Sequence, residues 1–233
     1  MLIFQESHLK SYLQHDCILN QLNQSEFTID KSFTSCKWLE DSAPKRLIYY
    51  YMYQDLLEKS NISLKVLDVG GGYSPLTRII INNHNYKLLE IFAHDNNEKL
   101  ENLKSTYNNK SFWYITDWYN YTPESSYDLI IANDLFPNVD QRLQLFLDKY
   151  LPISKKIRLS LTYYNEPRFY RVKRTEADEI LWLLAWSGEY LALTLEKYKE
   201  RIEKPAFDLL LKKHESLFPN KRQVVMVNIK GDL

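Results

Sequence analysis

Three consecutive glycines follow a short apolar run in the first third of the chain. The run covers residues 64–69 and contains Asp68, and Gly70, Gly71 and Gly72 come directly after it. The whole chain has only 5 glycines among 233 residues, so three in a row mark a place where the backbone needs them. Glycine permits tight turns and, without a Cβ, lets a ligand lie against main-chain amides. The triplet therefore predicts a turn at which a polar ligand meets bare backbone.

A helix start follows this turn. Ser74 is a residue type favoured at the N-cap position, and Pro75 suits the first helical position. Residues 76–82 continue with helical spacing. Unpaired N–H groups and the positive end of the dipole make a helix N-terminus attractive to anions. We therefore expect the turn and the helix start to present their N–H groups to one ligand.

Polar side chains also follow the next three apolar runs. Along the chain these are Asp95 with Asn96 after residues 87–94, Asp117 with Trp118 after residues 112–115, and Asn133 with Asp134 after residues 127–132. A single acid in such a place is ordinarily a helix cap or a solvated loop residue. Three of them in step with a glycine turn indicate one binding edge instead.

The apolar runs alternate with segments of helical spacing. The expected strands are residues 64–69, 87–94, 112–115, 127–132, 157–161 and 222–229, and the expected helices include residues 97–107 and 142–150. Such alternation is typical of βαβ units, whose ligands bind beyond the carboxyl ends of the parallel strands. We therefore expect an α/β fold, a Rossmann-like, doubly wound and mostly parallel sheet with helices on both faces.

Residues 66–74 resemble the first motif of the class I S-adenosylmethionine-dependent methyltransferases, in which an acidic residue precedes G-x-G-x-G. The segment reads Val-Leu-Asp-Val-Gly-Gly-Gly-Tyr-Ser, so Gly70 and Gly72 match the first two glycines and Ser74 stands at the third. The resemblance covers residues 45–162 and, more weakly, the last strand. It implies a methyltransferase with S-adenosyl-L-methionine as its cofactor.

The resemblance also implies a role for each matching residue. Asp68 would hold the methionine ammonium, directly or through water. Asp95 would accept the two ribose hydroxyls, and Asp117 would receive the adenine amine with Trp118 as a stacking face. The other expected cofactor contacts are Gly70, Gly71, Gly72, Asn96 and Asn133.

One methyltransferase domain is expected over residues 1–233. Its parts are an N-terminal helical segment (1–60), the cofactor-binding core (61–162), a helical insertion that covers the acceptor (163–220) and the last strand (221–233). Ser42 predicts the cap of the last N-terminal helix. Residues 175–178 resemble a capping box, which would open a helix with Trp182 and Trp186 in its core.

A nicotinamide dinucleotide enzyme is the nearest alternative, and the spacing argues against it. Its fingerprint is G-x-G-x-x-G, whose third glycine lets helix and strand pack closely. Counted from Gly70, that position holds Pro75. Asp68 also stands where such fingerprints are usually apolar.

Two residues are candidates for the catalytic base. A hydroxyl acceptor must lose its proton, and a well-placed base accelerates this by roughly 10²–10⁴-fold. Asp134 is the first candidate, because the fourth strand end faces the methyl group in the family, although it could instead cap a helix. His94 is the second, as the histidine beside a motif. Tyr163 and Tyr164 are expected to be walls of the pocket.

A cluster of basic residues follows the fifth strand. Arg168 and Arg171 lie within it, interleaved with Phe169 and Tyr170. The cluster is either a solvated loop or a clamp for a phosphate or carboxylate, which arginine binds in bidentate fashion. The expected acceptor is thus a small polar molecule such as a sugar or, if the cluster is a clamp, an anionic one such as a phosphorylated metabolite. The alternatives are a non-catalytic cofactor-binding partner of a complex and, less favoured, an RNA methyltransferase.

Composition bears on partners and compartment. Lys and Arg number 30, as do Asp and Glu, and the resulting neutrality argues against a general nucleic-acid or membrane binder. Cys17 and Cys36 lack the spacing of a metal site, and free thiols favour a reducing cytoplasm. Metal-assisted methylation would need ligands such as Asp134, Asn165 and Glu166, whose spacing is loose, so no metal is expected. No apolar run reaches the roughly 20 residues of a membrane span. The abundance of Asn, Lys, Ile and Tyr, which have AT-rich codons, points to a bacterial source.

Overall fold

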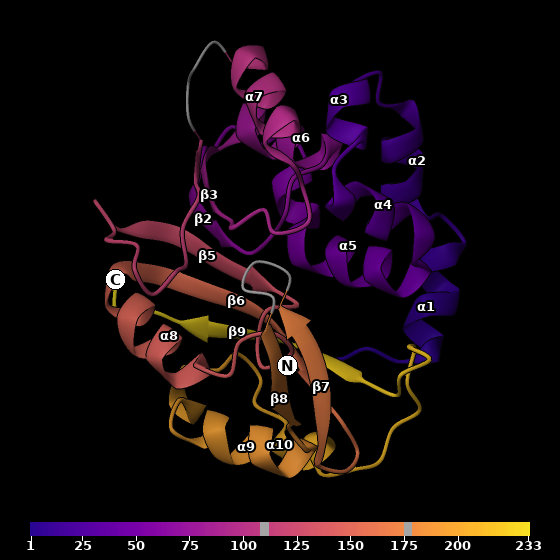
Figure 1. Cartoon of the computed structure of the whole chain (residues 1–233). Coiled ribbons are helices and arrows are strands. Elements are labelled where there is room, and N and C mark those ends of the chain that lie inside the picture. Colours follow the sequence, from indigo (N-terminus) through magenta and orange to yellow (C-terminus); the bar gives the residue numbers. More distant parts are fainter. Residues whose placement is uncertain (108–111, 175–178) are drawn as a thin grey trace.

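The core of the protein is a seven-stranded sheet with helices on both faces (Figure 1). The structure is a computed structural model that describes residues 1–107, 112–174 and 179–233. The strand order is β1 (Leu2–Ile3), β9 (Gln223–Lys230), β6 (Ser154–Tyr163), β5 (Tyr127–Asn133), β2 (Lys65–Val69), β3 (Asn85–Leu89) and β4 (Trp113–Tyr114). Neighbours from β6 to β4 are parallel, whereas β9 is antiparallel to both β6 and β1. The expected α/β, mostly parallel fold is confirmed.

Alternate residues of the central strands enter two separate cores. Leu67 and Val69 of β2 pack with α8 (Leu143–Tyr150) and α9 (Gly188–Glu196) on one face of the sheet. Val66 packs on the other face, against α5 (Ala43–Leu57), α6 (Pro75–Asn83) and α7 (Asn97–Thr106). Asp68 follows the same alternation and therefore points toward the α5 face.

The N-terminal helical segment contains a short strand and four short helices before Ser42. After β1 come α1 (Glu6–Leu13), α2 (Cys17–Gln24), α3 (Thr28–Lys31) and α4 (Thr34–Asp41). Ser42 then caps α5 as predicted, its side chain accepting a hydrogen bond from the Lys45 N–H. Buried ion pairs hold this layer together: Arg46 binds Asp16, and Arg78 of α6 binds Asp30 of α3.

The second strand of the core ends earlier than its apolar run suggests. The sequence predicts a strand over residues 87–94, but β3 stops at Leu89. Glu90 follows, and its Oε1 accepts hydrogen bonds from the Ile91 and Phe92 N–H groups, which turns the chain out of the sheet. Phe92 has a positive φ of 51° and is buried, so an apolar residue continues the run without belonging to the strand. Asp95 therefore lies in the loop before α7 and does not end a strand.

Residues 163–220 are not mostly helical, which corrects the prediction from the sequence. They contain an antiparallel hairpin, β7 (Arg168–Arg174) and β8 (Glu179–Ala185), before α9, the 3₁₀ turn η2 (Lys199–Arg201) and α10 (Phe207–Leu210). The expected capping box at 175–178 lies outside the described residues. Trp186 is buried as expected, but Trp182 is 67% exposed. The continuous apolar run 180–185 fits a strand as well as a helix, because periodicity does not separate the two in short runs.

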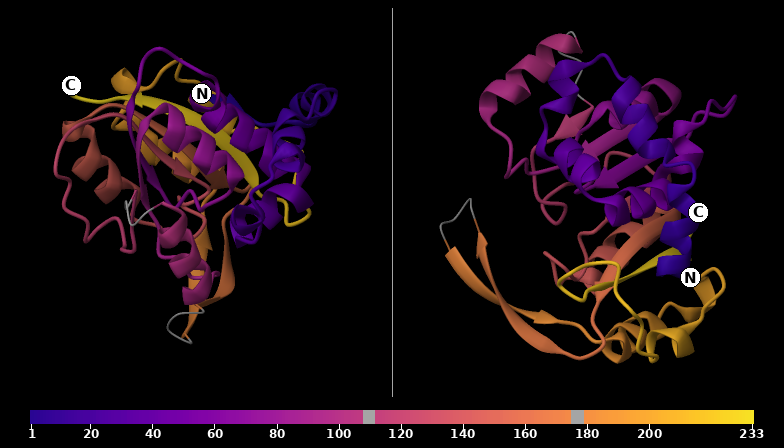
Figure 2. Two further views of the ribbon diagram at one scale, coloured as in Figure 1. Left: turned by 90° about the horizontal axis from the view of Figure 1, so that it is seen from above. Right: turned by 90° about the vertical axis from the view of Figure 1, so that its right-hand side faces the viewer.

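The hairpin projects from the body of the protein as an arm (Figure 2). Its side chains alternate between two faces, so Arg168 and Tyr170 point one way while Phe169 and Arg171 point the other. The Tyr170 hydroxyl donates to the carbonyl of Asn138, which ties one face of β7 to the loop after β5. The arm is thus tied to the body of the protein near the carboxyl edge of the sheet.

The contact between α9 and α10 generates a prediction about stability. Gly188 begins α9, and a Cβ there would overlap the carbonyl oxygen of Leu210. Because backbone cannot move aside as a flexible side chain does, we expect Gly188→Ala to lower the free energy of unfolding by roughly 1–3 kcal/mol. Urea denaturation measures this change. Glu189→Ala, at the adjacent exposed position, is the matched control and should change stability by less than about 0.5 kcal/mol. Equal stability of the two variants would contradict the contact.

Candidate active site

The glycine turn after β2 has the backbone that the triplet predicts. Gly70 and Gly72 have φ angles of 71° and 67°, in the left-handed region that glycine enters without strain. A Cβ at Gly71 would overlap the carboxylate of Asp68, and one at Gly72 would lie 2.6 Å from the Cβ of Ser35. The turn is therefore packed closely from both sides.

Neighbouring elements hold the turn in place. The Gly70 N–H donates to the Leu89 carbonyl at 2.8 Å, joining the turn to the end of β3. Ser74 caps α6 in a reciprocal box with Thr77, as its residue type predicts. From the other side the Ser35 hydroxyl, at the start of α4, donates to the carbonyl of Tyr73. The N-terminal helices are thus part of the wall around the turn.

Asp68 lies beneath the turn and is 2% exposed. Its Oδ1 accepts a hydrogen bond from the Tyr53 hydroxyl (3.1 Å) and its Oδ2 one from the Tyr86 hydroxyl (2.8 Å). Burial raises the pKa of Asp68 to about 7, and the two tyrosine hydrogen bonds oppose this rise. Through these two hydrogen bonds, Asp68 links α5 and β3 to the end of β2, directly below the glycine turn.

Glu90 is the carboxylate that directly follows β3, and the sequence analysis did not select it. Its Oε2 accepts a hydrogen bond from the Gly72 N–H at 3.1 Å, so it lies beside the glycine turn. Burial raises the pKa of Glu90, against the opposing effect of its three main-chain donors. A usable signal was present: in Rossmann folds the ribose-binding acid stands about 20 residues after the glycine motif. Glu90 follows Gly70 by 20 residues, and Asp95 by 25.

Asp95 and Asn96 make contacts with the N-terminal layer and with α7. Asp95 accepts hydrogen bonds from the N–H and hydroxyl of Thr34 (3.0 and 3.1 Å) and from Lys99 (3.0 Å). Asn96 caps α7 by accepting from the Lys99 N–H. These contacts anchor the start of α4. Asp95 therefore binds the N-terminal layer and does not occupy the strand end expected from the sequence.

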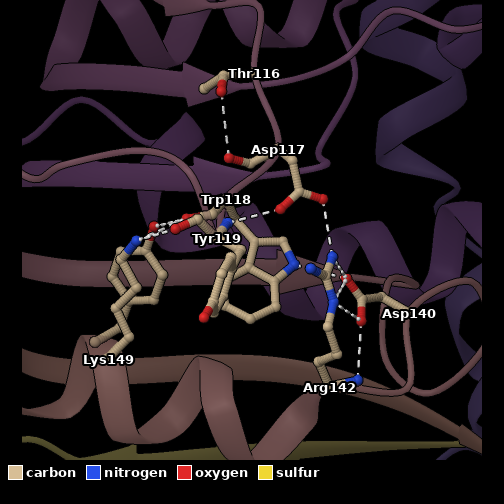
Figure 3. A network of polar contacts seen from close by, with 8 residues as sticks. Thr116, Asp117, Trp118, Tyr119, Asp140, Arg142 and Lys149 are labelled. Atoms are coloured by element: carbon tan, nitrogen blue, oxygen red, sulfur yellow. Dashed lines mark hydrogen bonds and ion pairs between the residues drawn. The ribbon is translucent and has the colours of Figure 1, made fainter.

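Asp117 and Trp118 belong to a polar network beyond β4 (Figure 3). The two Asp117 oxygens accept hydrogen bonds from the Tyr119 N–H and from Arg142, both at 2.8 Å. Trp118 is 3% exposed and donates its indole N–H to Asp140 at 2.7 Å. Arg142 also lies over the indole, 4.8 Å from the ring centroid. Trp118 is therefore a core residue and has almost no exposed face on which adenine could stack, whereas Asp117 remains at the sheet edge.

Asp134 stands at the carboxyl end of β5 and is held in an ion pair. Both of its oxygens lie 2.9 Å from Nη1 of Arg222, and Thr162 and Asn138 donate to Oδ1. It does not cap a helix, since the next helix begins at Leu143. Asn133 accepts a hydrogen bond from the Ser160 hydroxyl at 2.6 Å.

The other expected site residues are spread over several surfaces. His94 is exposed on the loop after β3, with its ring 5.2 Å from that of Trp38. Arg168 lies over the ring of Tyr164, at 4.6 Å, whereas Arg171 is on the opposite face of β7. Tyr163 is fully buried and Tyr164 nearly so. The structure thus separates Arg168 from Arg171 and keeps His94 on the side of α4.

Arg222 was also missed, and its position follows from strand direction. Because β9 is antiparallel to β6, the start of β9 lies at the edge where the parallel strands end. Arg222 immediately precedes β9 and so reaches Asp134. A basic residue just before an antiparallel final strand is therefore a candidate for a side chain at the carboxyl edge of the sheet.

Comparison with known proteins identifies the fold. No protein-family model matches the chain, and no curated protein is similar to it in sequence. The structure of DhpI bound to S-adenosylhomocysteine is similar, with a TM-score of 0.52, 12% identity, and coverage of 99% of this chain and 100% of that one. The Burkholderia thailandensis 1,6-didemethyltoxoflavin-N1-methyltransferase, bound to 1,6-didemethyltoxoflavin and S-adenosylhomocysteine, has a TM-score of 0.51, 14% identity, and coverage of 100% and 93%. The N-terminal domain of EvdMO1 with S-adenosylhomocysteine has a TM-score of 0.50, 15% identity, and coverage of 81% of both chains.

The chain has the fold of the class I S-adenosylmethionine-dependent methyltransferases. Because the sequence identities are only 12–15%, these structural similarities establish the fold alone. The activity has to be argued from the site. In the part of the chain that the structure describes, every helix is too short or too polar to cross a lipid bilayer.

The buried carboxyl of Asp68 generates a prediction about pH. Its pKa is about 7 in the folded protein, against an ordinary value of 3.8. As the pH rises above about 4 the unfolded chain ionises first, so this group's contribution to stability is present at low pH and lost by about pH 7. The full loss is about 4 kcal/mol.

We expect Asp68→Asn to remove this pH dependence. The unfolding free energy of the variant should fall less between pH 4 and pH 7.5 than that of the wild type, as measured by urea denaturation at several pH values. Asp95→Asn, which removes a carboxylate outside the core, is the control and should keep the wild-type profile. Parallel profiles for Asp68→Asn and the wild type would show that Asp68 ionises normally in the fold.

Proposed function

We propose that the protein is an S-adenosyl-L-methionine-dependent methyltransferase that modifies a small polar molecule. One observation carries the proposal: a glycine turn with two left-handed residues lies directly against a carboxylate, Glu90, at the end of the next strand. This arrangement suits a ligand with a charged group that binds the glycine turn and two neighbouring hydroxyls that donate hydrogen bonds to Glu90. The fold supports the same conclusion.

The residues of the turn fit the cofactor. The cofactor supplies a methyl group on a positively charged sulfur. The main chain of residues 70–72 would hold its amino-acid part, and Glu90 its ribose hydroxyls, because carboxylate–hydroxyl hydrogen bonds are strong when charge-assisted. Asp117, with its oxygens at the edge beyond β4, would receive the adenine amine. Glu90 thus takes the role that the sequence analysis gave to Asp95.

The chain's own work is then to place the acceptor and manage its proton. Transfer from a sulfonium is an in-line displacement, so orientation of the acceptor supplies most of the acceleration. Asp134 is the proposed proton acceptor for a hydroxyl, because it stands at the end of β5 with its carboxylate held by Arg222 and Thr162. O-methylation is accordingly the proposed reaction.

Binding of the cofactor tests the proposal. The purified protein should bind S-adenosylmethionine and S-adenosylhomocysteine in isothermal titration calorimetry and should not respond to NAD, since Pro75 stands where a dinucleotide fingerprint needs glycine. With labelled cofactor and a metabolite extract, label should pass to a small molecule. Heat from NAD with none from either adenosyl compound would end the proposal, and binding without any transfer would favour a non-catalytic partner.

Glu90 and Asp95 form a matched pair for a sharper test. We expect Glu90→Gln to weaken binding of S-adenosylhomocysteine tenfold or more, because hydrogen bonds to a charged group contribute about 1.5–3 kcal/mol. Asp95→Asn should leave the affinity within about twofold, because its partners are Thr34 and Lys99. If calorimetry instead showed a large loss of affinity for Asp95→Asn and little change for Glu90→Gln, Asp95 would be the residue that binds the ribose.

A further inference from the structure

Arg222 contacts Asp134 at the carboxyl edge of the sheet, and two further cationic side chains, Lys45 and Arg168, form a group with it. Arg222 is the most buried of them, with 8% of its side chain exposed. Its Nη1 contacts Asp134, and its guanidinium lies over the ring of Phe218 at 3.9 Å. Its Nε is buried and has no hydrogen-bond partner among the residues that the structure describes. A buried donor without a partner costs free energy, so this N–H calls for an acceptor.

Lys45 is the second member of the group. It is half-buried on α5, and its ammonium lies 4.4 Å from the ring centroid of Trp38. Within residues 1–107, 112–174 and 179–233, no carboxylate makes a salt bridge with it. Burial lowers the pKa of Lys45, while Asp134 raises it and Arg222 lowers it further. The charges of Asp134 and Arg222 thus act on the Lys45 ammonium.

Arg168 joins the group through the hairpin. The Tyr170 hydroxyl donates to the carbonyl of Asn138, and the Asn138 amide donates to Asp134, which places this face of β7 over the same edge. Arg168 donates to the carbonyl of Asn220 and lies over Tyr164, so its own charge is not matched by a carboxylate contact in the described structure. The group thus contains three cations and one anion, an excess of two positive charges.

We propose that Lys45, Arg168 and Arg222 bind a carboxylate or phosphate group of the methyl acceptor beside Asp134. An unpaired guanidinium N–H, an ammonium without a carboxylate and an aromatic wall are what such a group needs for recognition. Asp134 keeps Arg222 in place, and the anion neutralises the remaining charge. The proposal rests on the proposed methyltransferase function, since it assigns the acceptor to this edge. It differs from the clamp expected from the sequence, because Arg171 lies on the other face of β7.

Titration with small anions tests the proposal on the purified protein. Inorganic phosphate and malonate are added at constant ionic strength to the protein loaded with S-adenosylhomocysteine, and tryptophan fluorescence is recorded. Trp38 reports the event because Lys45 lies on its ring, so Trp38→Phe should abolish most of the signal. We expect a saturable response to at least one probe. A stronger response to phosphate marks a phosphorylated acceptor, and a stronger response to malonate marks a carboxylic acid.

Matched variants separate this site from general charge effects. Lys45→Gln and Arg168→Gln should each weaken the anion about tenfold, as expected for the loss of one charged hydrogen bond. Lys37→Gln, exposed next to Trp38, and Arg171→Gln, on the opposite face of β7, should leave it within about twofold. Arg222→Gln is a further variant whose folding is first checked by circular dichroism.

The outcomes are distinguishable from failure of the proposed function. Calorimetry with S-adenosylhomocysteine reports the cofactor site, and the anion titration reports the acceptor site. Normal cofactor binding with an anion response that is absent, or that falls equally in the Lys37 and Lys45 variants, would overturn the anion site alone.

Discussion

The contact of Gly71 with the buried carboxyl of Asp68 is the constraint on which the rest of the site depends. No side chain fits between them, so the turn lies directly on the end of β2. Asp68 in turn is bound by Tyr53 of α5 and Tyr86 of β3, which fixes two further elements to the same point. A polar group buried this deeply is stable only when its hydrogen bonds are satisfied, so the helices and the sheet can pack here in one arrangement.

The proposed acceptor edge combines residues from four distant parts of the chain, and this explains its charge. Lys45 comes from the N-terminal layer, Asp134 from the end of β5, Arg168 from the hairpin and Arg222 from the start of β9. Each is unremarkable in its own segment. The reversal of β9 and the return of α5 over the sheet bring them together, so the excess of positive charge is a property of topology in a chain whose net charge is zero.

The features that could be predicted from the sequence are those set by local interactions. The glycine turn, the caps at Ser42 and Ser74 and the alternation of strands and helices depend on neighbouring residues alone, and all are present. The end of β3 could not be placed, because Ile91 and Phe92 continue the apolar run while Glu90 turns the backbone. The hairpin could not be distinguished from a helix, since a short apolar run such as residues 180–185 has no distinguishing period. Arg222 and Lys45 depend on long-range packing, which no local pattern contains.

The pairing of β1 with β9 has a consequence for synthesis on the ribosome. Residues 2–3 are made long before residues 223–230 of β9, the strand through which they join the sheet. Until then the outer edge of β6, ten residues long and largely buried in the finished fold, has no partner strand. About 60 residues separate β6 from β9, which corresponds to roughly 3–12 s of translation. An unpaired apolar edge invites association with other chains, so the nascent protein passes through an interval in which protection by a chaperone matters most.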